Sequence, residues 1–172
     1  MLSSLVAAAA CQSPPAEIPS GDGEIVYTDQ GLGLTFALPA DWAMTHAGTA
    51  VVFAGASPET HFTTLTLQAS TPGPDAELAA VLDTTYASLD EAPIAWRARV
   101  PVDVAAGAGL AYLVSFTLWE KPRLRAGVLL RVGDSVADLS YTAPAELFAA
   151  GLDAYERAFE TLVLEPPDGG YP

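Results

Sequence analysis

Cysteine and histidine, which often carry nucleophilic or metal chemistry, are rare in this chain: it has one cysteine, Cys11, and two histidines, His46 and His61. Nucleophilic catalysis needs a serine or cysteine beside a base and an oxyanion site. The chain has no G-x-S-x-G turn, because Ser57 in GASPE lacks the second glycine. A single cysteine excludes an intrachain disulfide and a thiolate-rich zinc site. We therefore assign no catalytic residue and no cofactor, and we expect a protein that is not an enzyme.

The two histidines are the remaining candidates for a metal site. Both are expected near strand ends, where the imidazoles together with Glu59 or Asp41 would offer ligands to a divalent metal. Neither histidine lies in a recognised ligand spacing. We therefore interpret both as surface loop residues and predict no metal.

The charge balance narrows the choice of partner. The 172 residues include 21 Asp and Glu against 7 Lys and Arg, which gives a formal net charge of -14. A field of this sign disfavours nucleic acid and anionic lipid, so we expect neither polyanion as a partner. In such an acidic chain, paired carboxylates such as Asp134 and Asp138 are expected to be solvated surface charges.

The few basic residues are clustered, and six of the seven fall between positions 97 and 131. Strand alternation places Arg97 and Arg99 on one face of their strand and Arg123, Arg125 and Arg131 on one face of another. If the two faces coincide, these five arginines form a candidate partner surface that would steer an acidic protein partner. Long basic side chains on strand ends also serve as solvated edge charges that deter aggregation. The sequence leaves both interpretations open.

The strands that would position these residues are indicated by short β-type runs between Gly, Pro and Asp signals. Turns at Lys121–Pro122 and Gly133–Asp134 would join the later runs into an antiparallel meander. The runs span residues 24–28, 34–38, 50–54, 62–69, 94–103, 109–120, 124–132 and 135–141.

Helical spacing predicts one helix over residues 75–89 and a second that begins at Thr142 and Pro144 and continues through Phe159. Residues 162–164 would add a last short strand. The run over 109–120 is apolar on both faces, so elements must cover the sheet centre on each side. The sequence therefore predicts an α+β fold, an antiparallel sheet of about seven strands with helices packed on both faces.

An apolar segment at the start of the chain, LSSLVAAAA over residues 2–10, runs directly into Cys11. This pattern resembles the lipobox of bacterial lipoproteins, although Ala8 stands where leucine is usual and no Lys or Arg precedes the segment. The resemblance implies an exported bacterial protein that a lipid on Cys11 holds at a membrane. The protein would lie on the outer face of the cytoplasmic membrane, in the periplasm or at the outer membrane.

Four segments follow from this interpretation. Residues 1–10 would be a lipoprotein-type signal segment, 11–23 the anchor cysteine with a flexible linker, 24–164 a single domain and 165–172 a disordered tail. No apolar run approaches the roughly 20 residues that a membrane helix needs, so we expect a soluble body.

Three passages of the body carry a family resemblance: GLGLTFALPADWAMT (31–45), AGLAYLVSFTLWE (108–120) and SYTAPAELFAAGLDAYERAFETLVL (140–164). They resemble the opening strand, the aromatic-rich strand and the closing strand and helix of the PsbP-like family, which includes bacterial exported lipoproteins of the DcrB type. The resemblance covers residues 24–164 and implies a three-layer α/β/α fold. These are packing motifs, so no catalytic residue transfers with them.

The sequence as a whole predicts a non-enzymatic exported lipoprotein that serves as a protein-binding or assembly module at the membrane surface. One alternative is a protein that binds a small ligand or a divalent metal in a cleft between a helix and the sheet. Another is a hydrolase or metal-dependent enzyme whose site assembles only in three dimensions. A deep pocket with convergent titratable groups would favour the alternatives, whereas a shallow surface without them would favour the binding module.

Overall fold

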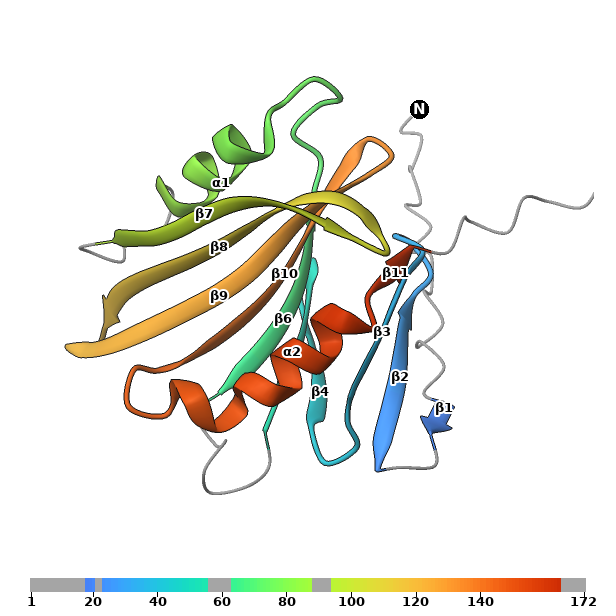
Figure 1. The fold of residues 1–172 in the computed structure, drawn as a ribbon, viewed down its shortest axis with the longest axis vertical. Coiled ribbons are helices and arrows are strands. Elements are labelled where there is room, and N and C mark those ends of the chain that lie inside the picture. The colour runs from blue at the N-terminus through green and yellow to red at the C-terminus, as the bar shows by residue number, and fades with distance from the viewer. Residues whose placement is uncertain (1–17, 21–22, 56–62, 88–93, 165–172) are drawn as a thin grey trace, which may run out of the picture.

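The structure, a computed structural model, describes residues 18–20, 23–55, 63–87 and 94–164. The larger of its two antiparallel sheets has seven strands in the order β4-β5-β6-β10-β9-β8-β7 (Figure 1). Their bounds are Ala43–Ala47 (β4), Ala50–Ala54 (β5), Thr64–Ser70 (β6), Ala95–Val104 (β7), Gly107–Leu118 (β8), Lys121–Val132 (β9) and Ser135–Pro144 (β10).

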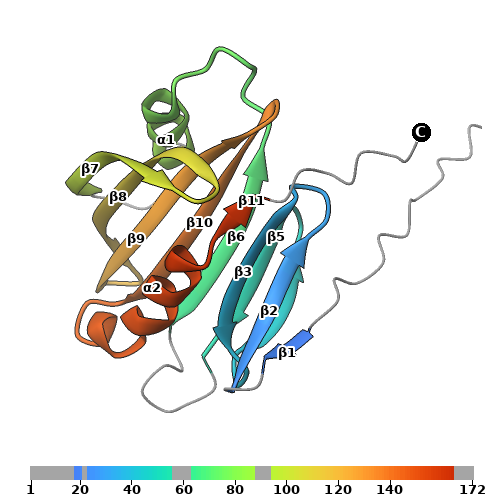
Figure 2. The same ribbon diagram turned by 45° about the vertical axis from the view of Figure 1, so that its right-hand side comes forward.

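The smaller sheet has the order β1-β2-β3-β11. It contains Ile18–Ser20 (β1), Glu24–Asp29 (β2), Leu34–Pro39 (β3) and Val163–Leu164 (β11). The helices are α1 (Leu78–Ala87), a short 3-10 helix η1 (Phe148–Gly151) and α2 (Leu152–Glu160). Helix α1 lies on one face of the larger sheet over β8 and β9, while α2 and the smaller sheet lie on the opposite face (Figure 2). None of the helices in the described ranges is long and apolar enough to span a membrane.

Strand β8 shows how alternation positions these layers. Tyr112, Val114 and Phe116 point to the α1 face and are buried there against α1. Leu113 points to the other face, opposite Ala126 of β9, and both side chains are only partly buried. One face of this hairpin is therefore covered and the other is largely open.

The main core lies between the two sheets and α2. Tyr27, Phe36 and Phe53 pack there with ring centroids 5.0 to 5.8 Å apart, in tilted or edge-on geometries. Such aromatic pairs add about 0.5 to 1.5 kcal/mol each to the free energy gained by burial. Trp42 is buried in the same cluster, and Ala158 of α2 packs against it without exposure to solvent. This core fixes α2 beside the larger sheet.

The predicted fold class is confirmed: the sheet of seven antiparallel strands carries helices on both faces. Two strands were not predicted. The residues of β4, AMTHA, are mostly exposed and lack apolar alternation. Strand β1 pairs with β2, although it falls within residues 11–23, where we expected a linker.

Two predicted boundaries are wrong. Strand β10 continues to Pro144, where we expected a helix to begin, because Thr142 and Ala143 are buried and keep their pairing with β9. The turn between β8 and β9 consists of Trp119 and Glu120, since the next two residues already belong to β9. The predicted turn at Gly133–Asp134, between β9 and β10, is confirmed.

Candidate functional site

The face of the sheet beneath α1 holds a polar network around Asp138. Tyr112 Oη donates a hydrogen bond to Asp138 Oδ1 at 2.9 Å and lies 3.1 Å from Oδ2. Burial raises the pKa of the Asp138 carboxyl to about 6, and the Tyr112 hydrogen bond and the positive charge of Arg125 oppose that rise. The expectation that Asp134 and Asp138 are both solvated is wrong for Asp138. Its position in β10, on the same face as the buried Val136, was the signal in the sequence.

Arg125 joins this network to α1. Its Nε donates to Thr142 Oγ1 at 2.7 Å, and its Nη1 donates to Tyr86 Oη at 3.4 Å. The guanidinium also lies over two aromatic rings, 5.6 Å from the centroid of Tyr86 and 5.3 Å from that of Phe116. These contacts engage Arg125 within its own chain.

Two further arginines attach α1 and the segment before it to the sheet. Arg99 Nη2 donates to Asp83 Oδ1 on α1 at 2.5 Å. Arg131 donates from its two terminal nitrogens to the carbonyl oxygens of Gly73 and Ala76, just before α1 begins. The arginines of this face therefore position α1.

A β-bulge between Trp96 and Ala98 directs Arg97 away from the other arginines. The extra residue breaks the alternation of β7. As a result, Arg97 Nε donates to Ser115 Oγ at 3.1 Å on the face opposite α1. Arg99 instead stacks on Trp96 on the α1 face, 3.6 Å from the ring centroid. The prediction that Arg97 and Arg99 share a face is wrong for this reason.

Arg123 completes the predicted set and lies opposite Phe116, on the α1 face. Its Nε is buried and has no hydrogen-bond partner within the described part of the chain. The five arginines thus do not form one continuous surface. Recognition of a partner by any of them stays a prediction.

The opposite face of β7, β8 and β9 carries an open hollow of about 280 Å³. Helix α2 and the smaller sheet leave this part of the face uncovered (Figure 1). Val100, in the edge strand β7, is 53% exposed there. Burial, and secondarily the charge of Asp138, raises the pKa of Tyr155, so its phenol stays neutral. The hollow is lined by apolar side chains that include Ala98, Val100, Leu113, Ala126, Tyr155 and Phe159.

The turn between β8 and β9 presents the most exposed large apolar side chain of the described residues. Trp119 is 83% exposed, and its φ of 50° and the φ of 65° at Glu120 are both left-handed. This conformation costs a residue other than glycine about 1 kcal/mol or more. The next turn of the same meander has Gly133 at the corresponding position, with a φ of 57°. The signal for this turn in the sequence was the Trp119–Glu120 pair at the end of the apolar alternation. The predicted strand over residues 109–120 wrongly included both residues.

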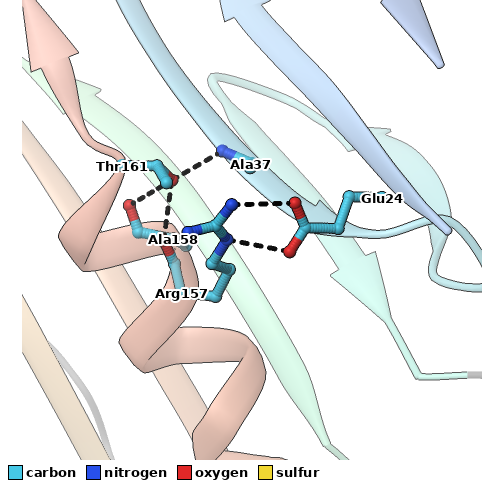
Figure 3. Close-up of polar contacts among 5 residues, drawn as sticks. All are labelled: Glu24, Ala37, Arg157, Ala158 and Thr161. Atoms are coloured by element: carbon cyan, nitrogen blue, oxygen red, sulfur yellow. Dashed lines mark hydrogen bonds and ion pairs between the residues drawn. The ribbon is translucent and has the colours of Figure 1, made fainter. Parts of the chain in front are cut away.

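Polar contacts fix the C-terminal end of α2 to the smaller sheet (Figure 3). Arg157 donates from Nε to Glu24 Oε1 at 2.8 Å and from Nη2 to Oε2 at 3.0 Å. This two-point contact lowers the pKa of the Glu24 carboxyl. Thr161 Oγ1 accepts a hydrogen bond from the Ala37 amide at 2.9 Å and donates to the Arg157 carbonyl at 2.7 Å. These bonds hold the aromatic border of the hollow in place.

The remaining predicted site residues do not assemble into a site. His46 in β4 and Asp41 before it are exposed. Across residues 18–20, 23–55, 63–87 and 94–164, no three His, Cys, Asp or Glu side chains could together hold a metal ion. Four residues that the sequence analysis weighed lie outside the described ranges: Cys11, Ser57, Glu59 and His61.

No protein-family model matches the chain, and no curated protein matches its sequence. Solved structures do resemble it. CyanoP, the cyanobacterial PsbP of Synechocystis, superposes with a TM-score of 0.58 at 14% identity, over 86% of this chain and 98% of CyanoP. The Ran-binding protein Mog1p of Saccharomyces cerevisiae gives a TM-score of 0.59 at 11% identity, over 87% and 96% of the two chains.

A further similar structure is LpqN of Mycobacterium tuberculosis, described as involved in cell envelope biogenesis. Its TM-score is 0.56 at 15% identity, over 88% of this chain and 90% of LpqN. This chain spans only 50% of a larger Bacteroides thetaiotaomicron protein that it also resembles, with a TM-score of 0.59 at 14% identity. Identities this low show a shared fold and nothing more specific. The chain therefore has the PsbP-like fold.

Proposed function

We propose that this protein is a non-enzymatic, exported bacterial lipoprotein that binds another protein through the turn between β8 and β9. The observation that carries the proposal is Trp119, which is 83% exposed in a strained conformation that the neighbouring turn avoids with glycine. A two-residue hairpin turn requires a positive φ, which glycine, asparagine or aspartate accepts at a lower cost than tryptophan. The side chain buries little within its own chain, so we infer that its large apolar area serves contact with another molecule.

Tryptophan is well suited to such a contact because it offers a large, rigid apolar area with a single polar N–H. Burying the ring in a partner's pocket would contribute on the order of 4 kcal/mol from the apolar area removed from water. The net charge of -14 favours a partner that is basic around that pocket. We propose this basic partner in place of the acidic partner that the arginines suggested. Arg99, Arg125 and Arg131 are engaged with their own chain.

We propose in addition that a lipid on Cys11 anchors the mature chain outside the cytoplasm. The lipobox-like segment supports this, as does the likeness in fold to LpqN, a protein described as involved in the cell envelope. Strands β1 and β2, the first described elements of the chain, lie across the molecule from the β8–β9 turn in both views (Figure 1, Figure 2). A membrane tether would thus leave the turn free to meet a partner.

The partner is tested by affinity isolation from native membranes, using the wild type, Trp119→Gly and a control, Asp134→Ala, in the exposed β9–β10 turn. We expect a defined protein to be retained by the wild type and the control but not by Trp119→Gly. The free energy of unfolding of Trp119→Gly should stay within about 0.5 kcal/mol of the wild type, since glycine accepts the positive φ. Retention of the same protein by all three would contradict the proposal.

The anchor has its own test, the intact mass of the protein isolated from its native host. We expect the mass of a chain that begins at lipid-modified Cys11, and a soluble or unprocessed product from Cys11→Ala. An unmodified thiol on the native protein would remove the anchor and leave the partner proposal standing.

A further inference from the structure

We propose that the hollow on the open face of β7, β8 and β9 binds a medium-chain carboxylate, with its acyl chain against the apolar lining and its head group on Arg97. This site is separate from the Trp119 turn and does not depend on the protein-binding proposal. The shape and chemistry of the hollow and the position of one cation beside it support this site.

The hollow offers apolar area and space on one side of an otherwise covered sheet. Its volume of about 280 Å³ is many times what a single water molecule needs and leaves room for an acyl chain of medium length. Small side chains line the part of the hollow that lies on the sheet: Ala98, Ala111 and Ala126. Phe159 of α2 borders the hollow on one side. An acyl chain needs no hydrogen-bond partner, so such a lining can bind it through burial of area alone.

Arg97 supplies the charge that a carboxylate needs. The bulge turns its side chain to the open face, where Nε donates to Ser115 Oγ and the Ser115 hydroxyl in turn donates to the Ala95 carbonyl at 3.3 Å. The two terminal nitrogens of Arg97 have no protein partner within the described part of the chain. Ala98 follows Arg97 directly, and Leu113 precedes Ser115 by two residues on the same face of β8; both line the hollow. The guanidinium therefore lies on the same face as the hollow, beside its lining residues.

The charges around the hollow also set the direction in which an amphiphile would lie. On α2, the exposed Glu156 and Glu160 directly follow Tyr155 and Phe159, which border the hollow. A negative head group is repelled at that border and attracted at the β7 bulge. We therefore expect the anionic head group to lie at Arg97 and the acyl chain to run toward α2.

The test is isothermal titration calorimetry of the full chain with dodecanoate and with dodecyltrimethylammonium, which has the same chain and the opposite head charge. We expect dodecanoate to bind one molecule per chain and more tightly than the cation. Arg97→Gln should weaken dodecanoate about fivefold and leave the cation no weaker. Lys121→Gln, which removes a cation that is paired with Leu118 beside the β8–β9 turn, should change neither affinity.

A second variant tests the hollow itself. Val100→Trp places a large ring from an exposed position of the edge strand and should abolish binding of both amphiphiles while thermal unfolding is unchanged. If that variant unfolds at a lower temperature, Ala98→Phe takes its place with the same expectation.

The absence of dodecanoate binding, equal affinity of Arg97→Gln, or full binding by the filled variants would each overturn the proposal. If dodecanoate does not bind, the hollow would instead be a docking site for apolar side chains of a protein partner. Trp119→Gly should bind dodecanoate normally, which separates this site from the turn.

Discussion

Tyr112 reaches Asp138 by crossing Gly127. The phenol of β8 passes over the backbone of β9 and donates its hydrogen bond at 2.9 Å to a carboxylate of β10. A Cβ atom at Gly127 would lie 2.4 Å from Tyr112 Oη. Three neighbouring strands are thus tied together beneath α1, and the middle strand must carry glycine for the bond to form.

The first prediction concerns this crossing. Gly127→Ala should lower the free energy of unfolding by about 1 to 3 kcal/mol, because the methyl group displaces the Tyr112 ring. Urea unfolding measures the change. In Tyr112→Leu the ring is absent, so adding Gly127→Ala to that variant should cost clearly less than it does in the wild type. Strictly additive changes would show that the Tyr112 ring is not what requires the glycine.

The second prediction is a pH dependence set by Asp138. Its pKa rises from 3.8 to about 6 on folding, chiefly through burial. The folded chain therefore holds more protons than the unfolded chain between about pH 4 and pH 6. The contribution of Asp138 to stability is fully present below its unfolded-state pKa. It is lost as the pH rises through its folded-state pKa. The change should be on the order of 2 to 3 kcal/mol.

Asp138→Asn removes this titration while keeping an acceptor for Tyr112 Oη. The difference in unfolding free energy between wild type and Asp138→Asn should therefore vary with pH in this window and become constant above it. Asp134→Asn, in the exposed turn, serves as the control and should keep the wild-type slope. A difference that stays flat from pH 4 to pH 7 would disprove the assignment.

The third prediction concerns the attachment of α2 to the smaller sheet. Thr161→Val removes the acceptor of the buried Ala37 amide and should cost about 1 to 2 kcal/mol of unfolding free energy. Thr84→Val is the matched control, because Thr84 Oγ1 is exposed and bonds only the Ala80 carbonyl of its own helix. Denaturant unfolding of the two variants should differ by at least about 0.5 kcal/mol. Equal losses would mean that the contact between the end of α2 and β3 adds nothing to stability.

Much of the fold could be predicted from the sequence because its strands alternate and its turns are marked. The apolar faces of residues 109–120 implied cover on both sides, and Gly133 with Asp134 marked a hairpin turn that the structure confirms. Strand β4 could not be predicted, because the side chains of Ala43–Ala47 are mostly exposed and its pairing with β5 comes from the backbone. Pairing supplied by a neighbouring strand leaves little trace in local residue pattern.

The site was harder to predict than the fold, for two physical reasons. A single extra residue in β7 moves Arg97 to the other face, and strand periodicity contains no mark of a bulge. The engagement of Arg125 with Tyr86 depends on where α1 lies on the sheet, a contact between residues 39 positions apart. Both effects arise from tertiary geometry, so charge patterning alone suggested a basic surface that the structure divides between two faces.

The most direct test of the account is site-specific photo-crosslinking in the native host, with benzoylphenylalanine replacing Trp119 in one strain and Asp134 in another. Both positions lie in exposed two-residue turns of the same meander, so the probe is exposed to solvent at each. If the β8–β9 turn binds a partner, a single protein product is crosslinked from position 119 and is absent from position 134. Identical products from the two positions, or none from position 119 while the protein is folded and exported, would contradict binding at this turn.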